Sequence, residues 1–405
     1  MINPFSFVEV RRNCLRSRVS LLLYHTRGAS IRLTRFQTKA VDSYVNSPCS
    51  FGATPIDCPQ SGGHFYNRRT SESRVQTSPH LAPGPAPSAA RLMGADMREV
   101  DNVIQRRLAS DVAMINQIAH YIISAGGKRI RPMLVLLFSS ALGFTGRERF
   151  ELAATVEFVH TATLLHDDVV DESALRRGRQ TANALFGNAA SVLVGDFVYS
   201  RAFQMMVSVN RMRVLEVLAD ATNVIAEGEV LQLMNMHDPD LAVDDYLRVI
   251  RFKTAKLFEA SARLGAVLAD ANPVIEESCA AYGRSLGTAF QLVDDLLDYE
   301  GATAELGKNV GDDLREGKPT LPLLIAMERG TDAERHLMRH AIQHGESARL
   351  QEIVDIVRKT GALAATRDAA RAEADKARGT LEALPASPFR DALLELCIRS
   401  VERSS

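Results

Sequence analysis

Apolar residues recur at the three- and four-residue spacing of an α-helix almost throughout the chain from about residue 96 onward. Val156, Val159, Thr163 and Leu164 form one such stripe. Further segments with this spacing are broken at Gly, Pro or Asn-Asp clusters, and they are 189–208, 213–236, 244–270, 274–299 and 318–328. Several are apolar nearly all round, which is typical of buried helices, and alternating strand patterns are scarce. The pattern predicts an all-α fold, a large helical bundle.

Residues 1–90 differ in composition from the rest. They hold eleven Arg or Lys residues against four acids, and they end on a Pro/Ala-rich linker. Helical periodicity is not sustained there, so we expect a disordered N-terminal extension followed by a single helical domain over 91–405. The Arg-rich, acid-poor composition also suits a mitochondrial transit peptide, and a translation start near Met93 or Met97 is a third interpretation. A transit peptide would place the protein in the mitochondrial matrix; otherwise we expect it in the cytoplasm.

Charge and cysteine content exclude several classes of protein. The net charge is −1, so no global field favours nucleic acid or an anionic membrane. No apolar run approaches the roughly 18 residues of a membrane span, and we therefore expect neither a nucleic-acid partner nor an integral membrane segment. The five cysteines are odd in number and form no CxxC, which argues against a disulfide framework or a zinc site and fits a reducing compartment.

Two acidic clusters of the form DDxxD follow apolar helical stretches. They comprise Asp167, Asp168 and Asp171, and Asp294, Asp295 and Asp298. The first and last Asp of each cluster share one face of a helix. Like charges stacked in this way repel one another unless a cation neutralises them, and hard oxygen ligands favour Mg²⁺. A solvated acidic face is the alternative for either cluster alone, but the pair favours a metal site.

Cationic residues form a second signal. Lys128, Arg129 and Arg131 follow two glycines and precede a helix that we expect to begin at Pro132. Helix N-termini and basic side chains bind phosphate groups readily. Further cations are Arg176, Arg177, Lys253, Lys308 and Lys318. The alternative for each of them is an ordinary charged, solvent-exposed surface. Together with the acidic clusters, however, these cations indicate a diphosphate pocket.

The order and spacing of these motifs resemble those of the trans-isoprenyl diphosphate synthases, and most closely the bacterial octaprenyl diphosphate synthases. The resemblance is carried by GGKRIRP, HTATLLHDDVVDES, LVGD, EGEVLQL, KTA, GTAFQLVDDLLDY and GKNVGDDLREGKPTLP. It runs from about residue 96 to the C-terminus. It implies an isoprenoid-synthase-type helical bundle with a central apolar cavity, which assembles as a homodimer. The implied enzyme is a prenyltransferase that adds isopentenyl diphosphate units to an allylic diphosphate.

The resemblance also implies the substrates, the metal and the roles of individual residues. The starter is expected to be farnesyl diphosphate and the product octaprenyl diphosphate for ubiquinone side chains, with three Mg²⁺ ions per site when substrate is bound. The residues implied for isopentenyl diphosphate are Lys128, Arg131, His160 and Arg177. Those implied around the allylic diphosphate are Arg176, Lys253, Thr254, Gln291, Lys308 and Lys318. The implied metal ligands are Asp167, Asp168, Asp171, Asp294, Asp295 and Asp298, which act in catalysis with Lys253 and Thr254.

Product length depends on the apolar path that leads away from Asp167. The residues four and five before it are Thr163 and Ala162, which lie roughly along this path on a helix. Short-chain members of the family resemble one another in placing Phe or Tyr there, so small residues imply a deep tunnel. Phe203 and Met206 are the candidates for its floor, with ordinary core packing as the alternative.

Three other functions remain as alternatives. A terpene cyclase or head-to-head condensing enzyme would lack GGKRIRP. A metal phosphohydrolase, suggested by His166 beside Asp167, would need further His ligands and would leave Asp294–Asp298 unexplained. An inactive subunit of a heteromeric synthase would be expected to lose one acidic cluster, whereas both are intact.

Overall fold

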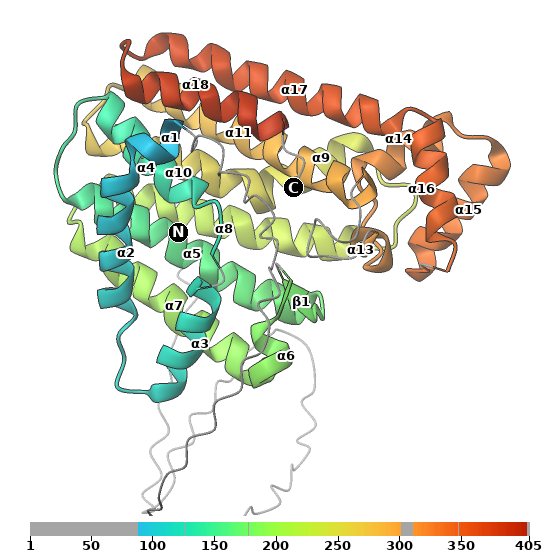
Figure 1. Ribbon diagram of the computed structural model, residues 1–405, viewed down its shortest axis with the longest axis horizontal. Coiled ribbons are helices and arrows are strands. Elements are labelled where there is room, and N and C mark those ends of the chain that lie inside the picture. The colour runs from blue at the N-terminus through green and yellow to red at the C-terminus, as the bar shows by residue number, and fades with distance from the viewer. Residues whose placement is uncertain (1–87, 125, 177, 301–310, 347, 403–405) are drawn as a thin grey trace, which may run out of the picture. The chain divides into compact units, whose positions relative to one another are not determined.

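Helices account for most of the residues that the computed structural model describes, which are 88–402 except 125, 177, 301–310 and 347 (Figure 1). These described residues belong to one compact unit, Pro79–Ser405. The predictions about residues 1–87 lie outside the described part. The first helix begins at Ser88, and Ala89 in it is buried. The N-terminal helices are α1 (Ser88–Leu92), α2 (Gly94–Leu108), α3 (Ala113–Ser124) and α4 (Ile130–Ala141).

Long buried helices form the centre of the bundle. They are α5 (Glu148–Val170), α7 (Asn188–Ser208), α8 (Met212–Asn235), α10 (Lys256–Leu268) and α11 (Pro273–Glu300). The α5 helix packs along α7 and α4, and α10 packs against α4, α8 and α11 (Figure 1). Their apolar faces build the larger of two hydrophobic cores, with fully buried side chains such as Phe138, Phe158 and Phe258. The all-α prediction is confirmed.

A short hairpin and a short helix follow α5. Strands β1 (Leu175–Arg176) and β2 (Arg179–Gln180) pair antiparallel, and α6 (Ala182–Phe186) comes next. The turn of the hairpin contains Gly178, whose φ of 71° lies in the left-handed region that glycine tolerates. This hairpin places residues after the first acidic cluster back against the end of α5.

The C-terminal helices build a second core. They are α13 (Asp312–Arg315), α14 (Leu321–Arg329), α15 (Asp332–His344), α16 (Leu350–Lys359), α17 (Ala362–Thr380) and α18 (Pro388–Val401), with a 3₁₀ turn η2 (Leu381–Ala383) before α18. Helix α17 lies along α11, as Figure 1 shows. The second core gathers apolar residues of these helices with α9 (Val243–Ile250) and the end of α11. Both acidic clusters lie near the junction of the two cores.

The predicted helix limits agree with the structure except in three places. The segment 244–270 is not one regular helix, because α9 and α10 are joined by a π-helical turn, η1 (Arg251–Ala255). The segment 318–328 becomes helical only at Leu321. The helix expected to begin at Pro132 begins two residues earlier, at Ile130.

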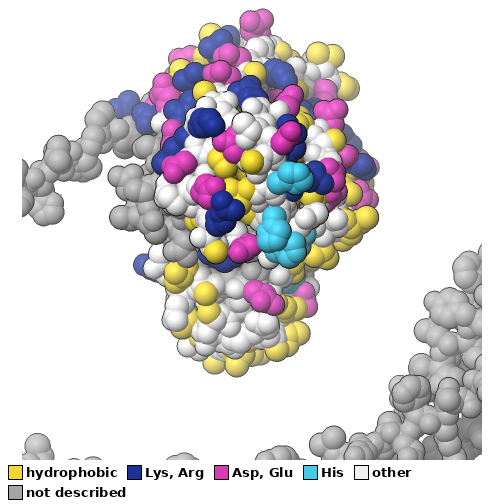
Figure 2. Space-filling model, turned by 90° about the vertical axis from the view of Figure 1, so that its right-hand side faces the viewer, with side chains coloured by type: hydrophobic (Ala, Val, Ile, Leu, Met, Phe, Trp, Pro, Cys, Tyr) yellow, Lys and Arg dark blue, Asp and Glu magenta, His cyan; other side chains and the backbone are white. Residues whose placement is uncertain are grey.

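The surface is charged and mixed. Figure 2 shows the end of the unit where α14–α16 lie, with acidic and basic side chains interspersed around a group of histidines. A cavity of about 630 Å³ lies between α15 and the segment that leads into α16, and His336 and His340 are among its lining residues. Within the described residues, no helix is long and apolar enough to cross a membrane. Cys279 and Cys397 are buried free thiols.

Candidate active site

Both acidic clusters lie at the C-terminal ends of long helices. The first occupies the last turn and the C-cap of α5, and the second occupies the last turns of α11. Backbone carbonyls at a helix C-terminus carry partial negative charge, so carboxylates there are destabilising, and repulsion between the carboxylates adds to this cost. Such an arrangement needs compensating cations. In the described part of the chain, two lysines from different segments contact the first cluster.

The first of these cations is Lys253 in η1. Its Nζ lies 2.6 Å from Oε2 of Glu229 on α8 and 3.9 Å from Oδ2 of Asp167 on α5. Burial raises the pKa of Glu229 above its ordinary value, although Lys253 opposes this shift. Lys253 therefore links α5 to α8 from a π-helical turn, a feature that often occurs at functional sites.

Two glycines allow the neighbouring helices to approach η1 closely. A Cβ at Gly228 of α8 would lie 2.6 Å from the backbone N of Lys253, and a Cβ at Gly287 of α11 would lie 2.7 Å from Cα of Ala255. Ordinary carbon contacts are about 3.5 Å or longer, so a larger side chain at either position would displace the turn. The position of the η1 backbone is therefore set by packing between α8 and α11.

A hydrogen-bond chain runs from η1 through α11 to α9. Thr254 Oγ1 donates to Oε1 of Gln291 at 2.9 Å, and Nε2 of Gln291 donates to Oδ1 of Asp295 at 2.7 Å. The hydroxyl of Tyr246 donates to the other oxygen, Oδ2, of Asp295. Tyr246 and Asp295 are both buried. Burial, and then the charge of Asp313, raise the pKa of Asp295 to about 7 despite the hydrogen bonds that it accepts.

The second cation, Lys318, contacts the acidic end of α5. Its Nζ lies 3.1 Å from Oδ2 of Asp171 and 2.5 Å from Oε2 of Glu316. The backbone N–H of Asp313, in the preceding helix α13, donates to Oδ2 of Asp298 at 3.3 Å. Burial opposes the charged form of Lys318, but the surrounding carboxylates raise its pKa above the usual value. The α13 segment therefore bridges the ends of α5 and α11.

Asp168 is fully buried and faces the hairpin. Arg176 Nε donates to its Oδ1 at 2.7 Å, and Nδ2 of Asn183 donates to its backbone oxygen at 3.0 Å. Its Oδ2 is buried without a hydrogen-bond partner among the residues that the structure describes. Burial raises the pKa of Asp168 even beside Arg176.

The loop before α4 is anchored by a cation that sequence reasoning left without a role. Arg129 caps α4 with φ of 47°, in the left-handed region. Its guanidinium contacts Asp101 at 3.2 Å and Glu157 at 3.3 Å. This anchoring leaves the preceding Lys128 exposed in the loop.

The other two described residues expected to hold isopentenyl diphosphate lie on α4 and α5. The guanidinium of Arg131 lies 4.5 Å from the ring centroid of Phe258 on α10, a cation–π contact. His160 is half-buried on α5, two turns before Asp167. The fourth residue of this set, Arg177, and the predicted diphosphate lysine Lys308 lie outside the described residues.

Comparisons with known proteins identify the family of this chain. A family model described as Polyprenyl synthetase matches residues 112–358. Octaprenyl diphosphate synthase of Escherichia coli (strain K12) is 55% identical over 313 residues, which cover 77% of this chain and 97% of that protein. The chain belongs to the polyprenyl synthetase family.

Solved structures of the family show the same fold. The polyprenyl synthase of Caulobacter crescentus CB15, complexed with calcium and isoprenyl diphosphate, aligns with a TM-score of 0.76 at 48% identity, covering 78% of this chain and 98% of that one. A decaprenyl diphosphate synthase of Rhodobacter capsulatus aligns with a TM-score of 0.74 at 47% identity, with the same coverage. The isoprenoid-synthase-type fold expected from the sequence is therefore confirmed.

The predicted metal ligands do not form a complete coordination site made of protein side chains alone in the described part of the chain. Among the described residues, no three His, Cys, Asp or Glu side chains are placed to hold a metal by themselves. Mg²⁺, however, commonly binds through one or two carboxylates, water and substrate phosphates. The carboxylates with raised pKa values, each with burial as the largest cause, are Asp167, Asp168, Glu229, Asp295 and Glu316. A cation held jointly with a phosphate-bearing substrate would stabilise the charged form of these buried carboxylates.

The predicted chain-length residues divide into two groups. Ala162 and Met206 are fully buried in the larger core. Thr163 is half-buried on α5, and its hydroxyl donates to the backbone oxygen of His160 at 2.8 Å. Phe203, in contrast, is 38% exposed and packs edge-on against Tyr199. In the described single chain the Phe203 side chain therefore lies at the surface of α7, and its place in the tunnel floor stays a prediction.

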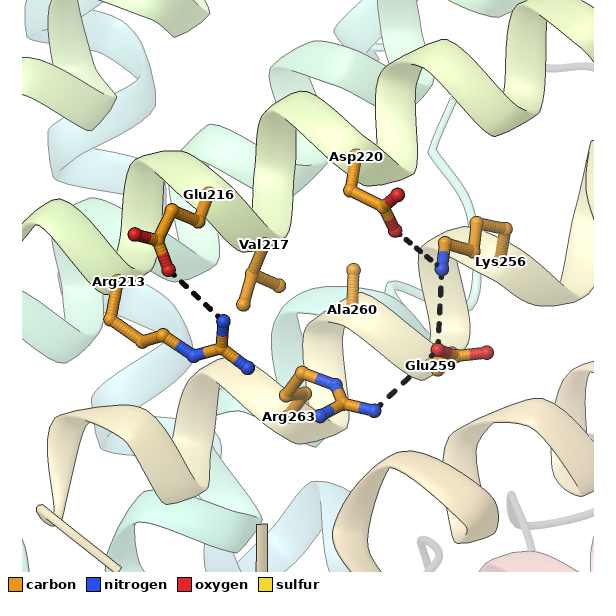
Figure 3. A pocket seen from close by; sticks show the side chains of 8 residues that line it. All are labelled: Arg213, Glu216, Val217, Asp220, Lys256, Glu259, Ala260 and Arg263. Carbon is orange, nitrogen blue, oxygen red and sulfur yellow. Dashed lines mark hydrogen bonds and ion pairs between the residues drawn. The ribbon is translucent and has the colours of Figure 1, made fainter. Parts of the chain in front are cut away.

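A small cavity of about 150 Å³ lies between α8 and α10, away from these site residues (Figure 3). Its charged side chains already pair with one another: Lys256 lies 2.8 Å from Asp220, and Arg213 lies 3.0 Å from Glu216. The Lys256–Asp220 pair joins α10 to α8, and the lining of this cavity contains none of the predicted substrate-binding residues. The predicted central apolar cavity stays a prediction.

Sequence reasoning gave no role to three residues that the structure places in this site. Glu229 contacts Lys253, Asp313 contacts Asp298, and Tyr246 contacts Asp295. Glu229 and Asp313 lie within the family motifs EGEVLQL and GKNVGDDLREGKPTLP, so the motifs marked their position without showing their partners. Tyr246 lies outside the recognised motifs, and its pairing with a residue 49 positions away follows only from the fold.

Proposed function

We propose that this chain is a Mg²⁺-dependent long-chain trans-polyprenyl diphosphate synthase, which condenses isopentenyl diphosphate units onto an allylic diphosphate. The observation that carries the proposal is the pairing of Lys253 with Asp167 and of Lys318 with Asp171 at the end of α5. Both lysines belong to segments that also contact the acidic end of α11. Two acidic helix ends with a shared set of cations suit a diphosphate and its metal ions.

The metal would be held by the first and last Asp of each cluster, which are Asp167, Asp171, Asp294 and Asp298. When bound, Mg²⁺ would stabilise the negative charge that develops on the departing diphosphate. The placement of Asp167 and Asp171 on one end of α5 beside Lys253 and Lys318 supports this assignment. Three ions per site stay a prediction.

The protein's own groups position the two substrates. Lys253, Arg176 and Lys318 would hold the allylic diphosphate, while Lys128, Arg131 and His160 would hold isopentenyl diphosphate. Fixing both partners converts a bimolecular step into an effectively unimolecular one. The oxygen atoms of Thr254 and Gln291 would face the positive charge that forms as the carbon–oxygen bond breaks, and the departing diphosphate can accept the final proton.

We further propose octaprenyl diphosphate as the product and farnesyl diphosphate as the starter, with ubiquinone side chains as the use. The Escherichia coli relative is named an octaprenyl diphosphate synthase, while the Rhodobacter capsulatus structure is of a decaprenyl diphosphate synthase. Small Ala162 and buried Met206 on the path from the diphosphate support a long product, since no aromatic ring stands at the first position.

A homodimer is proposed from the exposed faces of α7 and α8. Large apolar side chains that stay exposed on these helices are Leu193, Phe203, Val207, Met212, Val230, Leu233 and Met234. We propose that these side chains belong to one interaction surface, which a second copy would bury in a symmetric interface. The surface position of Phe203 then becomes an interface position.

Light scattering on the purified protein tests the homodimer. We expect a dimer for the wild type and a monomer for the double variant Val207→Asp, Leu233→Asp. Val274→Asp is the matched control, since Val274 is 74% exposed at the start of α11, and it should stay dimeric. A monomeric wild type at micromolar concentration would contradict the proposal.

Incorporation of labelled isopentenyl diphosphate tests the activity. We expect Mg²⁺-dependent incorporation into an allylic diphosphate by the wild type, and a loss of at least about 100-fold in Asp167→Ala and Asp294→Ala, with unchanged helical circular dichroism. Variants that keep wild-type turnover at limiting Mg²⁺ would refute the metal assignment.

A further inference from the structure

The two oxygens of the Asp295 carboxylate are both occupied by protein donors. Gln291 donates to Oδ1 from Nε2 at 2.7 Å, and Tyr246 donates to Oδ2 from its hydroxyl. Asp295 is 4% exposed and Tyr246 is equally buried. A metal ion would have to reach this buried carboxylate and compete with both donors, whereas its neighbour Asp294 is half-buried.

The hydrogen bonds of Asp295 fix the orientation of the Gln291 amide. Oδ1 of Asp295 accepts from Nε2 of Gln291 while Oδ2 accepts from Tyr246, so the NH₂ group of Gln291 faces the carboxylate. The amide oxygen Oε1 is then turned towards η1, where it accepts from Thr254 Oγ1 at 2.9 Å. The Thr254 hydroxyl proton is used in this bond. The lone pairs of the Thr254 oxygen are therefore available to a positive charge that develops beside Lys253.

Tyr246 is placed to hold the far end of this chain. Its ring packs in the second core with Leu292 of α11, and its hydroxyl donates to Oδ2 of Asp295. The buried ring therefore holds the hydroxyl proton against the carboxylate.

We propose that Tyr246 and Asp295 are positioning residues that set the direction of the Gln291–Thr254 hydrogen bond, and that Asp295 does not bind metal. The inference rests on the proposed function and deepens it. It assigns the two adjacent aspartates of the second cluster different tasks: Asp294 faces the metal and substrate, and Asp295 orients the dipoles beside the reacting carbon. If the amide turned over, Thr254 would receive a hydrogen bond and direct its own proton at a developing positive charge, which slows bond breaking.

Steady-state kinetics of Tyr246→Phe and Asp295→Asn test the proposal, with Tyr282→Phe as the matched control. Tyr282 is fully buried, and its hydroxyl donates to the backbone oxygen of Leu393 at 2.7 Å, away from the site. Phe keeps the ring packing in both tyrosine variants and removes one buried hydrogen bond. Asn keeps the size of Asp295 but offers a donor on one side, so the amide of Gln291 is no longer held in one orientation.

We expect kcat to fall about 10- to 100-fold in Tyr246→Phe and Asp295→Asn. The KM for isopentenyl diphosphate and the Mg²⁺ concentration for half-maximal rate should stay within about twofold of wild type. A twofold change corresponds to well under one pKa unit of free energy. Asp294→Asn should instead raise the Mg²⁺ requirement. Tyr282→Phe should lower the melting temperature as much as Tyr246→Phe does, with kcat unchanged.

Several outcomes would overturn the proposal. A Mg²⁺ requirement that rises in Asp295→Asn as much as in Asp294→Asn would make Asp295 a metal ligand. An unchanged kcat in Tyr246→Phe, or an equal loss in Tyr282→Phe, would show that the hydrogen-bond chain has only a structural role. These results presuppose a wild-type protein that extends chains; a wild type that does not would refute the proposed function itself, and the positioning role with it.

Discussion

Gly228→Ala should impair catalysis far more than it impairs folding. The added Cβ would lie 2.6 Å from the backbone N of Lys253 and 2.9 Å from Cβ of Phe252. Since carbon contacts are about 3.5–4.0 Å at their optimum, α8 and η1 must separate by about 1 Å. Lys253 and Thr254 would move with the η1 backbone, away from Asp167 and Gln291.

The two effects differ in size. Overpacking costs about 1–3 kcal/mol in the free energy of unfolding, and the higher helix propensity of Ala offsets about 1 kcal/mol of this. A displacement of about 1 Å at groups that position a substrate can cost about 100-fold in rate. We therefore expect a modest fall in melting temperature and a fall of about 100-fold in kcat for isopentenyl transfer.

Gly379→Ala provides the control for this variant. Gly379 lies within α17, and a Cβ there would meet no atom within 4 Å. The same substitution should therefore stabilise the protein by about 0.5–1 kcal/mol and leave turnover unchanged. The reasoning about η1 would be refuted if Gly228→Ala matched Gly379→Ala in both melting temperature and kcat.

Three further predictions concern other parts of the chain. Glu229→Gln should lower kcat because Lys253 loses its 2.6 Å ion pair, whereas Glu227→Gln on the exposed side of α8 should leave kcat unchanged. Equal kcat values of the two variants in steady-state assays would refute a positioning role for Glu229. Ala162→Tyr should shorten products to about three or four isoprene units, since a ring would block the buried path. Met206→Ala should lengthen the products by opening space. An unchanged product ladder on thin-layer analysis would show that the tunnel does not pass this face. Deletion of residues 1–87 should leave activity and melting temperature unchanged in vitro, because that composition buries little apolar surface, and a large loss of melting temperature would show that the segment packs on the helical unit. The deletion stops before Ala89, which is buried.

Helix positions and acidic clusters were predictable from the sequence because both depend on local spacing. The limits of α7, α8 and α11 lie within one or two residues of those predicted. The i, i+4 relation that groups Asp167 with Asp171 holds within any helix. These features needed no knowledge of how the helices pack.

Features that depend on packing were not predictable in this way. The π-helical turn at Lys253 follows from the close approach of α8 and α11 at Gly228 and Gly287, which single-sequence periodicity does not reveal. Phe203 and Met206 are three residues apart on α7, but Met206 is fully buried whereas Phe203 is 38% exposed in the single chain. The apolar spacing predicted the helix but not where on its circumference burial ends.

The most direct test of the account is the size of the product. Purified protein would be incubated with farnesyl diphosphate, excess isopentenyl diphosphate and Mg²⁺, and the dephosphorylated products sized by mass spectrometry. The account predicts a Mg²⁺-dependent product that ends at about eight isoprene units, abolished by EDTA. Products that stop at three or four units, or release of phosphate without chain extension, would contradict it.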